Sequence, residues 1–343
     1  MQILHFFAGG NTAQGFCSCF EDILPAAQRK RMYFIKGGPG VGKSTLMKRV
    51  GAAAEEKGLK VEYFHCSSDP DSLDGVSVPE QGIGLMDGTA PHVYDPAVPG
   101  ARDTLLSLGD FLDEEALRPH AGEIAEIQRD ISARFARCYR YLAAAREVLC
   151  AAPPPVENAA RARQLADGWA HSLPLRGGNG SVRRLFASAF TPKGLVTVSE
   201  LSGMDRCVTV ECPFGAYASE LMSGISRMAA ARGLDVIELL DPLCPDRIAH
   251  VMIPAHGVAF CTARQGEERK GEYVEASALF TGLSGNDAQQ RFDVNAYELL
   301  CQRATEQIAA AKALHDQLEA FYVKNMDFKG WQTVVDRVTD FGI

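Results

Sequence analysis

The stretch GGPGVGKST, residues 37–45, decides the fold class that we expect for this chain. It fits the phosphate-binding pattern G-x-x-x-x-G-K-[ST]. The four fixed positions hold Gly37, Gly42, Lys43 and Ser44. An apolar run at 32–35 precedes the stretch, and a helix-like run at 43–56 follows it. This order of strand, loop and helix predicts a phosphate-binding loop in an α/β fold. The alternative is a glycine-rich turn before an ordinary helix.

The residue types in this stretch suit phosphate chemistry. Glycines let backbone amides turn toward phosphate oxygens without a clash from Cβ, and the helix N-terminus adds partial positive charge. We expect Lys43 to reach the β- and γ-phosphates and the Ser44 hydroxyl to ligate Mg²⁺. The sequence therefore predicts that ATP and Mg²⁺ are held by the whole loop: Gly37, Gly38, Pro39, Gly40, Val41, Gly42, Lys43, Ser44 and Thr45.

The chain also contains an internal repeat. At an offset of 175 residues, 35–89 aligns with 210–264 without a gap, and 13 of the 55 pairs are identical. The match continues upstream, where FFAGGNTAQG (6–15) faces LFASAFTPKG (185–194). A period this long indicates a domain duplication, because solenoid repeats run about 20–50 residues.

The second copy lacks the residues that phosphate chemistry needs. In place of Gly37, Gly42 and Lys43 it has Cys212, Tyr217 and Ala218. The residues that are identical in both copies are mostly apolar residues, or glycines and prolines, which set the backbone conformation. We therefore predict one competent nucleotide site, in the N-terminal half, and a degenerate half that serves as scaffold, lid or regulator.

An acidic residue follows a second apolar run. The run at 83–87 ends in Asp87, which is the form of a Walker B strand. An Asp at the carboxyl end of a strand beside the loop can hold the Mg²⁺ water shell, so we predict that Asp87 is catalytic and metal-linked. Its counterpart is Thr262, which agrees with loss of the metal in the second copy. The alternative is a strand that happens to end in Asp before a glycine turn.

A polar segment at 67–75 contains three more acids, and we expect it to be a loop. It follows an expected strand at 60–66, and ligands of open α/β sheets bind at the carboxyl ends of strands. The three acids are Asp69, Asp71 and Asp74. Such acids can orient an attacking water, bind Mg²⁺ or accept a proton, or they can be solvated loop residues.

The repeat separates these three acids. Asp71 persists as an Asp in the second copy, which indicates a structural role. Asp69 is replaced by Cys, so we assign Asp69 to the catalytic set as the orienting acid. Asp74 is replaced by Ala249 and is a weaker candidate.

Residues after the expected Walker B strand could sense the γ-phosphate. They are Thr89 and His92, and the second copy has Arg264 in place of Thr89. If the halves pack pseudo-symmetrically, Arg264 could serve the first half as an arginine finger within the chain.

The pattern along the chain predicts four segments. These are an active P-loop NTPase-type unit (1–98), a helical segment and linker (99–180), a degenerate unit (181–275) and a C-terminal helical segment (276–343). Apolar residues at spacings of three and four predict long helices in both helical segments. We expect two three-layer α/β units of P-loop type, internally duplicated, each with a helical appendage, packed as a pseudo-dimer.

Composition limits the class of protein. The net charge of −8 argues against nucleic acid as the main partner, since such domains carry basic patches. No apolar run reaches the roughly 20 residues that span a bilayer, and the first ten residues lack the features of a signal peptide. We expect a cytoplasmic protein without a membrane partner, whose ten cysteines are reduced. Cys17 with Cys19, and His65 with Cys66, could bind metal or could be packing residues.

Four motifs together resemble an uncharacterised bacterial P-loop ATPase-like family with two P-loop-type repeats. They are FAGGNTAQGF (7–16), KGGPGVGKSTLMK (36–48), HCSSDPDSLDGV (65–76) and LMDGTAPHVYDP (85–96). The resemblance implies ATP binding at 37–45 and hydrolysis of ATP. The second loop departs from a working P-loop, so the resemblance does not imply a two-site mechanism here.

Three classes of function remain open on the sequence alone. The first is an ATPase or nucleotide-dependent switch. The second is a kinase that transfers the γ-phosphate to a small molecule or nucleotide, with Arg134, Arg137, Arg140 and Arg146 as a helical lid. The third is a non-catalytic nucleotide-binding module, which intact Lys43, Ser44 and Asp87 argue against. ATP is expected over GTP because the chain has no clear N-K-x-D motif.

Overall fold

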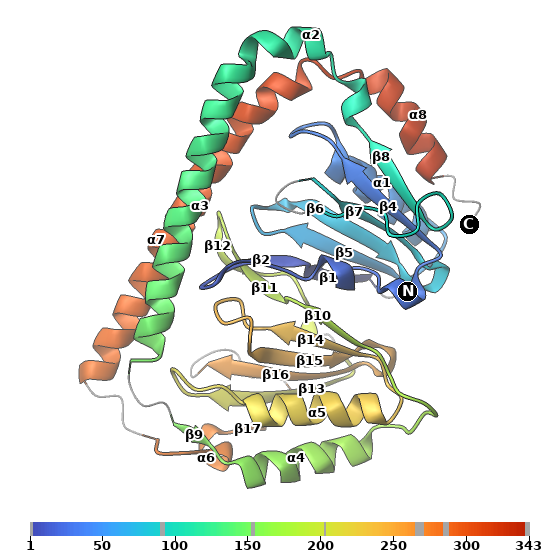
Figure 1. The fold of residues 1–343 in the computed structure, drawn as a ribbon. Coiled ribbons are helices and arrows are strands. Elements are labelled where there is room, and N and C mark those ends of the chain that lie inside the picture. Colours follow the sequence, from blue (N-terminus) through green and yellow to red (C-terminus); the bar gives the residue numbers. More distant parts are fainter. Residues whose placement is uncertain are drawn as a thin grey trace.

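The computed structural model describes residues 3–89, 93–151, 155–201, 204–264, 271–283 and 288–339. These residues form an α/β protein with two six-stranded mixed sheets, each accompanied by helices (Figure 1). The first sheet belongs to the N-terminal half, and the second sheet belongs to the half that follows residue 181.

The first sheet has the strand order β1-β5-β6-β7-β4-β8. Strand β6 runs antiparallel to both neighbours, and the other pairs are parallel. Helix α1 (Lys43–Glu56) covers one face. The strands are β1 (Ile3–Phe7), β4 (Arg31–Lys36), β5 (Val61–Cys66), β6 (Asp69–Val78), β7 (Ile83–Asp87) and β8 (Asp103–Ser107).

The second sheet repeats this plan strand for strand, in the order β10-β14-β15-β16-β13-β17. A bulge between Phe64 and His65 recurs between Leu239 and Leu240. These equal topologies match the internal duplication predicted from the sequence. The strands are β10 (Val182–Leu185), β13 (Arg206–Cys212), β14 (Val236–Leu240), β15 (Ile248–Ile253), β16 (Val258–Arg264) and β17 (Glu272–Val274), and helix α5 (Ser219–Ala231) corresponds to α1.

The two sheets pack face to face, which differs from the three-layer units that the sequence led us to expect. One continuous core joins Met32 and Phe34 of β4 to Ala259 and Cys261 of β16. Residues that alternate with these along β4, such as Tyr33, face α1 instead. Among the described residues, no α-helix lies between the sheets, so the order of layers is helix, sheet, sheet, helix (Figure 1). Strand β4 is apolar on both faces, and that pattern alone does not say whether a helix or a sheet covers its inner face.

The halves meet around a local two-fold axis. Phe7 and Phe186, which are equivalent in the repeat, exchange both backbone hydrogen bonds at 2.9 and 3.0 Å. Beside them, Arg183 of the second half forms a buried ion pair with Glu62 of the first half at 2.9 Å. One hairpin from each half flanks the axis: β2 (Gly9–Thr12) with β3 (Gly15–Ser18), and β11 (Ser188–Thr191) with β12 (Gly194–Thr197).

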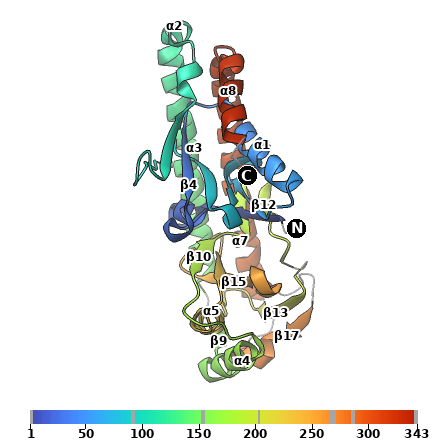
Figure 2. The same cartoon turned by 90° about the vertical axis from the view of Figure 1, so that its right-hand side faces the viewer.

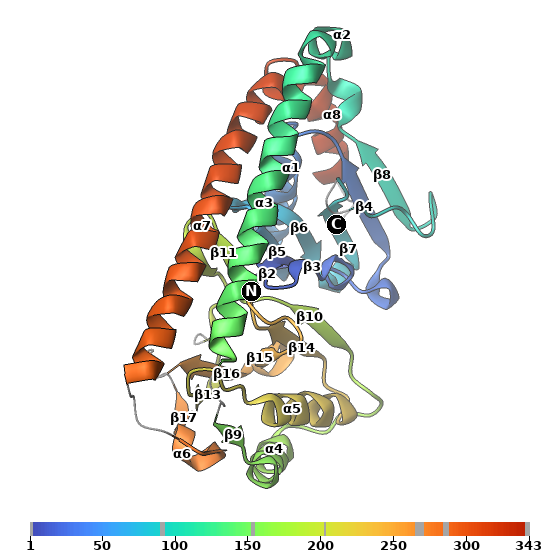
Figure 3. The same cartoon turned by 60° about the vertical axis from the view of Figure 1, so that its left-hand side comes forward.

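Two long helical arms cross between the halves. The central arm consists of α3 (Ala121–Leu149) and α4 (Ala159–Ser172), and the C-terminal arm consists of α7 (Ala288–Val323) and α8 (Phe328–Thr339). Helices α3 and α7 lie side by side along one edge of both sheets (Figures 1 and 3). Helix α4 then packs on α5, and α8 packs on α1 (Figure 2). The appendage that follows each half therefore covers the opposite half.

Several boundaries differ from those expected. The first sheet continues past residue 98 through β8, and β6 begins at Asp69, inside the segment expected to be a loop. The central segment contains β9 (Val156–Glu157), which pairs with β18 (Phe280–Thr281). Short elements complete the chain: α2 (Glu114–Leu117), α6 (Ala276–Leu279), and 3₁₀ turns at Phe20–Asp22, Ala26–Gln28, Pro79–Gln81, Gly109–Phe111, Arg118–His120 and Pro254–His256. Within the described ranges, none of the helices combines the length and apolarity needed to cross a bilayer.

Candidate functional site

The loop at 37–42 joins β4 to α1, in the order that the sequence predicts. Gly40 and Gly42 have φ angles of +70° and +85°. L-residues with a side chain rarely adopt this left-handed region, so both positions require glycine. Gly42 is the N-cap residue of α1 and supplies no side chain to the helix end.

Backbone amides at the start of α1 are left without protein acceptors. Among the described residues, no oxygen accepts a hydrogen bond from the amides of Gly40, Gly42, Lys43, Ser44 or Thr45. Unpaired amides around left-handed glycines, at a helix N-terminus, form an anion-binding concavity.

Lys43 lies over this loop. Its Nζ donates to the carbonyl oxygens of Gly37 at 2.8 Å and Gly38 at 2.9 Å. The same Nζ is 3.6 Å from Oδ2 of Asp87, and both side chains are mostly buried. A cation held at this place faces the amides of the loop and adds to their positive potential.

Asp87 ends β7, which is paired in parallel with β4. It therefore lies at the carboxyl ends of the strands, where the loop also begins. Its Oδ1 accepts from the amide of Thr89 at 2.8 Å. The Thr89 hydroxyl is in turn 3.1 Å from the Gly37 carbonyl oxygen, which ties the end of β7 to the loop. Thr89 therefore touches the loop, whereas His92 lies outside the described residues.

The hydroxyl of Ser44 faces β6. Its Oγ accepts from the amide of Leu73 at 3.0 Å. The structure thus brings Ser44, Lys43 and Asp87 to one place, and a hydroxyl and a carboxylate are oxygen ligands of the kind that Mg²⁺ takes.

The structure gives Asp74 a position that the sequence did not suggest. Its side chain is buried, with 5% exposed, and its Oδ2 has no hydrogen-bond partner. Burial and the nearby charge of Asp87 raise the pKa of Asp74 to about 7, and a hydrogen bond with Cys66 and the charge of Lys43 oppose this rise. Residues 73–78 are all buried, and interpreting 69–75 as strand would have placed Asp74 within this buried run.

Asp69 begins β6 and lies toward the C-terminal arm. Its Oδ2 accepts from the Ser72 hydroxyl at 3.0 Å and is 3.5 Å from Nζ of Lys312. Asp71 is exposed and forms an ion pair with Lys193, at the tip of the β11–β12 hairpin, at 2.7 Å. A pair between the halves agrees with the structural role assigned to Asp71.

The C-terminal arm covers the loop closely. A Cβ placed on Gly38 would lie 2.7 Å from the ring of Tyr322, and one on Gly40 would lie 2.6 Å from Val323. A Cβ on Gly42 would lie 2.9 Å from the indole nitrogen of Trp331. Arg49 of α1 stacks over the same indole at 5.1 Å. The loop glycines therefore also permit the close approach of α7 and α8.

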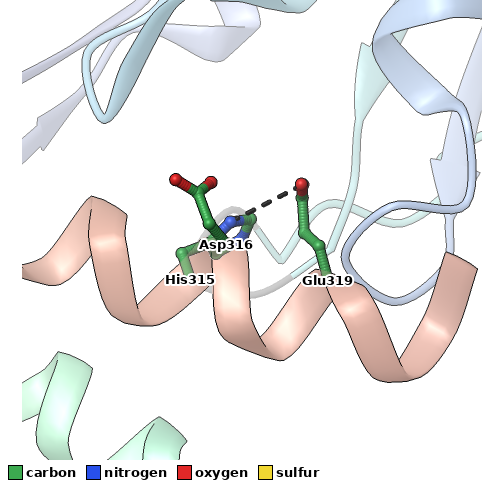
Figure 4. A group of neighbouring side chains, drawn as sticks. All are labelled: His315, Asp316 and Glu319. Carbon is green, nitrogen blue, oxygen red and sulfur yellow. Dashed lines mark ion pairs between the residues drawn. The ribbon is translucent and has the colours of Figure 1, made fainter.

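A polar row on α7 faces the same region (Figure 4). It consists of Lys312, His315, Asp316 and Glu319. His315 Nδ1 is 3.6 Å from Glu319 Oε1. Burial lowers the pKa of His315, an effect that the charge of Glu319 opposes. In the part of the chain that the structure describes, His315, Asp316 and Glu319 are the one group of three ligand-type side chains with ligand atoms within 4.8 Å of one another.

The other cysteine and histidine pairs do not gather a third ligand within the described ranges. His65 directs Nδ1 to the Pro70 carbonyl oxygen at 2.8 Å, and its Nε2 is 2.9 Å from Nδ1 of His5. Cys17 and Cys19 pack in the cluster around the local two-fold axis. Cys17 and Cys19 thus have a packing role, whereas Cys66 lies beside the carboxyl group of Asp74.

The corresponding loop of the second half is filled by aromatic side chains. Phe214 packs edge-on against Tyr297 of α7, with ring centroids 5.7 Å apart. Arg247 lies over the ring of Tyr217, the counterpart of Gly42, at 5.8 Å. Arg264 lies over Tyr297 at 5.5 Å, so it stays at the loop of its own half, and the arginine-finger hypothesis is wrong.

A carboxylate occupies the N-terminus of α5. Glu157, in β9 of the central arm, accepts from the amides of Glu220 at 2.8 Å and Leu221 at 2.9 Å. These amides are the counterparts of those of Thr45 and Leu46 in α1. The central arm, which follows the first half, therefore supplies an anion to the helix end of the second half. The arginines expected to form a lid lie on α3, where Arg134 contacts Gln307 of α7 and Arg146 lies near Cys244 of the second half.

Comparison with known proteins adds no relative: no family model, no curated protein and no solved structure matches the chain.

Proposed function

We propose that the protein binds ATP with Mg²⁺ and hydrolyses it at a single site, the loop at 37–45. The observation that carries this proposal is the set of unpaired amides at the start of α1 beside Lys43. In the second half, Glu157 accepts from the amides of Glu220 and Leu221, and the first of these corresponds to the unpaired amide of Thr45. This supports an anion as the natural partner of such a helix end. The resemblance to a P-loop ATPase-like family is part of the same proposal.

Each residue has a role in the proposed reaction. The loop amides and Lys43 bind the β- and γ-phosphates and stabilise charge on the transferring phosphoryl group. Mg²⁺, when bound, neutralises phosphate charge, and Ser44 and Asp87 are the residues that would hold it, directly or through water. Asp69 orients the attacking water, in the position next to Lys312. The C-terminal arm excludes bulk water from the loop, because Tyr322 and Trp331 cover it.

The first test is release of inorganic phosphate from Mg·ATP by the wild-type protein and by Lys43→Ala, side by side. We expect slow release in the wild type and none in Lys43→Ala, since the variant lacks the cation at the loop. Asp69→Asn should bind ATP as the wild type does and release phosphate much more slowly.

Other outcomes separate the remaining classes. Tight ATP binding without phosphate release would reject the ATPase and favour a kinase that lacks its acceptor, or a binding module. Absence of ATP binding by the wild type, with or without Mg²⁺, would overturn the proposal altogether.

A further inference from the structure

We propose that Asp74 is a ligand of a divalent cation and completes, with Asp87 and Ser44, a metal centre beside the loop. This inference deepens the proposed function and rests on it for the identity of the cation as Mg²⁺. The cation class itself follows from the oxygen ligands alone, because carboxylates and hydroxyls suit hard divalent ions such as Mg²⁺ and Mn²⁺.

The strand register brings Asp74 opposite Asp87. Strands β6 and β7 are antiparallel, and their last pair before these residues joins Gly75 to Met86. One step further along the ladder places Asp74 across from Asp87. Side chains directly opposite in such a pair have Cβ atoms roughly 4.5–5.5 Å apart. Two carboxylates therefore lie together near the carboxyl ends of β4 and β7, beside the loop.

Both carboxylates are on the face that carries α1. Asp87 is two positions from Leu85, which belongs to the core beneath α1, so Asp87 shares its face. Asp74 lies at the β-bulge of β6, between Leu73 and Val76, and both of these residues belong to the same core beneath α1. The bond from the Leu73 amide to Ser44 Oγ then fixes β6 against the first turn of α1. Three oxygen-bearing side chains from three elements converge at this point.

The second observation is that Asp74 is buried and incompletely satisfied. Its side chain is 5% exposed, and its Oδ2 has no hydrogen-bond partner. A buried polar atom without a partner is costly and rare in folded proteins. Two carboxylates side by side also repel each other when both are charged. Lys43, 3.6 Å from Asp87, is engaged with the carbonyl oxygens of Gly37 and Gly38. A divalent cation would satisfy the free oxygen and both charges.

The repeat provides an internal control. Ser44 persists as Ser219, whereas Asp74 and Asp87 become Ala249 and Thr262. The two acids are lost together in the half that has also lost Lys43. A purely structural acid, such as Asp71, is kept in both halves.

The experiment measures Mn²⁺ binding to the intact protein by electron paramagnetic resonance, without nucleotide and with a non-hydrolysable ATP analogue. We expect one Mn²⁺ per wild-type chain and at least about tenfold weaker binding to Asp74→Asn. The exposed Asp71→Asn variant is the matched control and should bind Mn²⁺ as the wild type does. Equal Mn²⁺ affinity in the wild type and Asp74→Asn would overturn the inference.

A direct measurement covers the case in which Asp74→Asn fails to fold. Anomalous scattering from wild-type crystals soaked in Mn²⁺ should place the ion about 2.1 Å from a carboxylate oxygen of Asp74. An ion held by Asp87 without Asp74, or an ion elsewhere, would overturn the inference. Nucleotide binding measured in the presence of a chelator reports on the proposed function separately. Absence of ATP binding together with Asp74-dependent Mn²⁺ binding would reject the ATPase and leave the metal centre standing.

Discussion

The two loops of this protein, 37–45 in the first half and 212–220 in the second, have the same position in the same sheet topology. They differ in what meets the amides at the helix end. In the first half the amides of Gly42, Lys43, Ser44 and Thr45 have no acceptor among the described residues, whereas in the second half Glu157 accepts from the amides of Glu220 and Leu221, the counterparts of Thr45 and Leu46. The sheet topology thus persists in the second half although Gly37, Gly42 and Lys43 of the first loop are replaced there by Cys212, Tyr217 and Ala218. In the second half a carboxylate from the chain itself meets the helix end, whereas our proposal places an external ligand at the helix end of the first half.

Gly42→Tyr would make the first loop resemble the second, and it is the change with the largest expected effect. Gly42 has a φ of +85° and touches Trp331, so a tyrosine there is strained by about 1–2 kcal/mol and displaces α8. We expect loss of binding of a fluorescent ATP analogue. Gly58→Ala is the control, because Gly58 has a φ of +74° and open space around it. Wild-type ATP affinity in Gly42→Tyr would show that the open loop is not the site.

The Asp74→Asn variant tests a difference between the halves through the pH dependence of the free energy of unfolding. The second half has Ala249 at the corresponding position, and alanine does not titrate. The folded-state pKa of about 7 lies above the unfolded value of about 4. The folded state therefore binds the extra proton between about pH 4 and pH 7, and the stability of the wild type falls as pH rises through this window. The whole difference is at most about 4 kcal/mol.

Urea denaturation in the presence of a chelator measures this effect. We expect Asp74→Asn to be more stable than the wild type at pH 8 and equally stable at pH 4, since Asn mimics the protonated acid. Asp71→Asn, an exposed position, should leave the pH dependence unchanged. Equal stability of Asp74→Asn and the wild type at every pH would contradict the conclusion that Asp74 is a buried carboxyl group with a raised pKa.

Glu157→Ala addresses the second loop and has the smallest expected effect. It removes the acceptor of the Glu220 and Leu221 amides, so we expect a loss of about 1–2 kcal/mol in the free energy of unfolding. Added sulfate should restore part of this stability, because an anion can then occupy the helix end. Glu147→Ala, exposed on α3, is the control. Unchanged stability in Glu157→Ala would mean that the carboxylate does not substitute for a ligand.

Sequence alone was sufficient for the features that are encoded locally. The glycines at 40 and 42 specify left-handed backbone, and the run ending in Asp87 specifies a strand beside the loop. The duplication was visible because glycines and apolar residues of the frame, such as Gly82 and Gly257, persist with the same backbone conformation.

Features that depend on which surfaces meet could not be predicted in this way. Tyr33 and Phe34 are both apolar, so β4 does not reveal that one face meets a helix and the other a sheet. The apolar stripe of α8, which includes Trp331, does not say which half it covers. Lys312 could not be connected with Asp69, because the contact between them depends on the crossing of the arm.

The crossed arms make the two halves inseparable as folding units. A chain cut in the linker between Ser172 and Val182 would leave the first fragment without α8 and the second without α4. Each fragment would then expose the apolar surface of α1 or α5 that the other fragment normally covers, in addition to the inner face of its sheet. The second half is therefore indispensable to the first, because the chain passes through it before α7 and α8 return to cover α1 and the first loop.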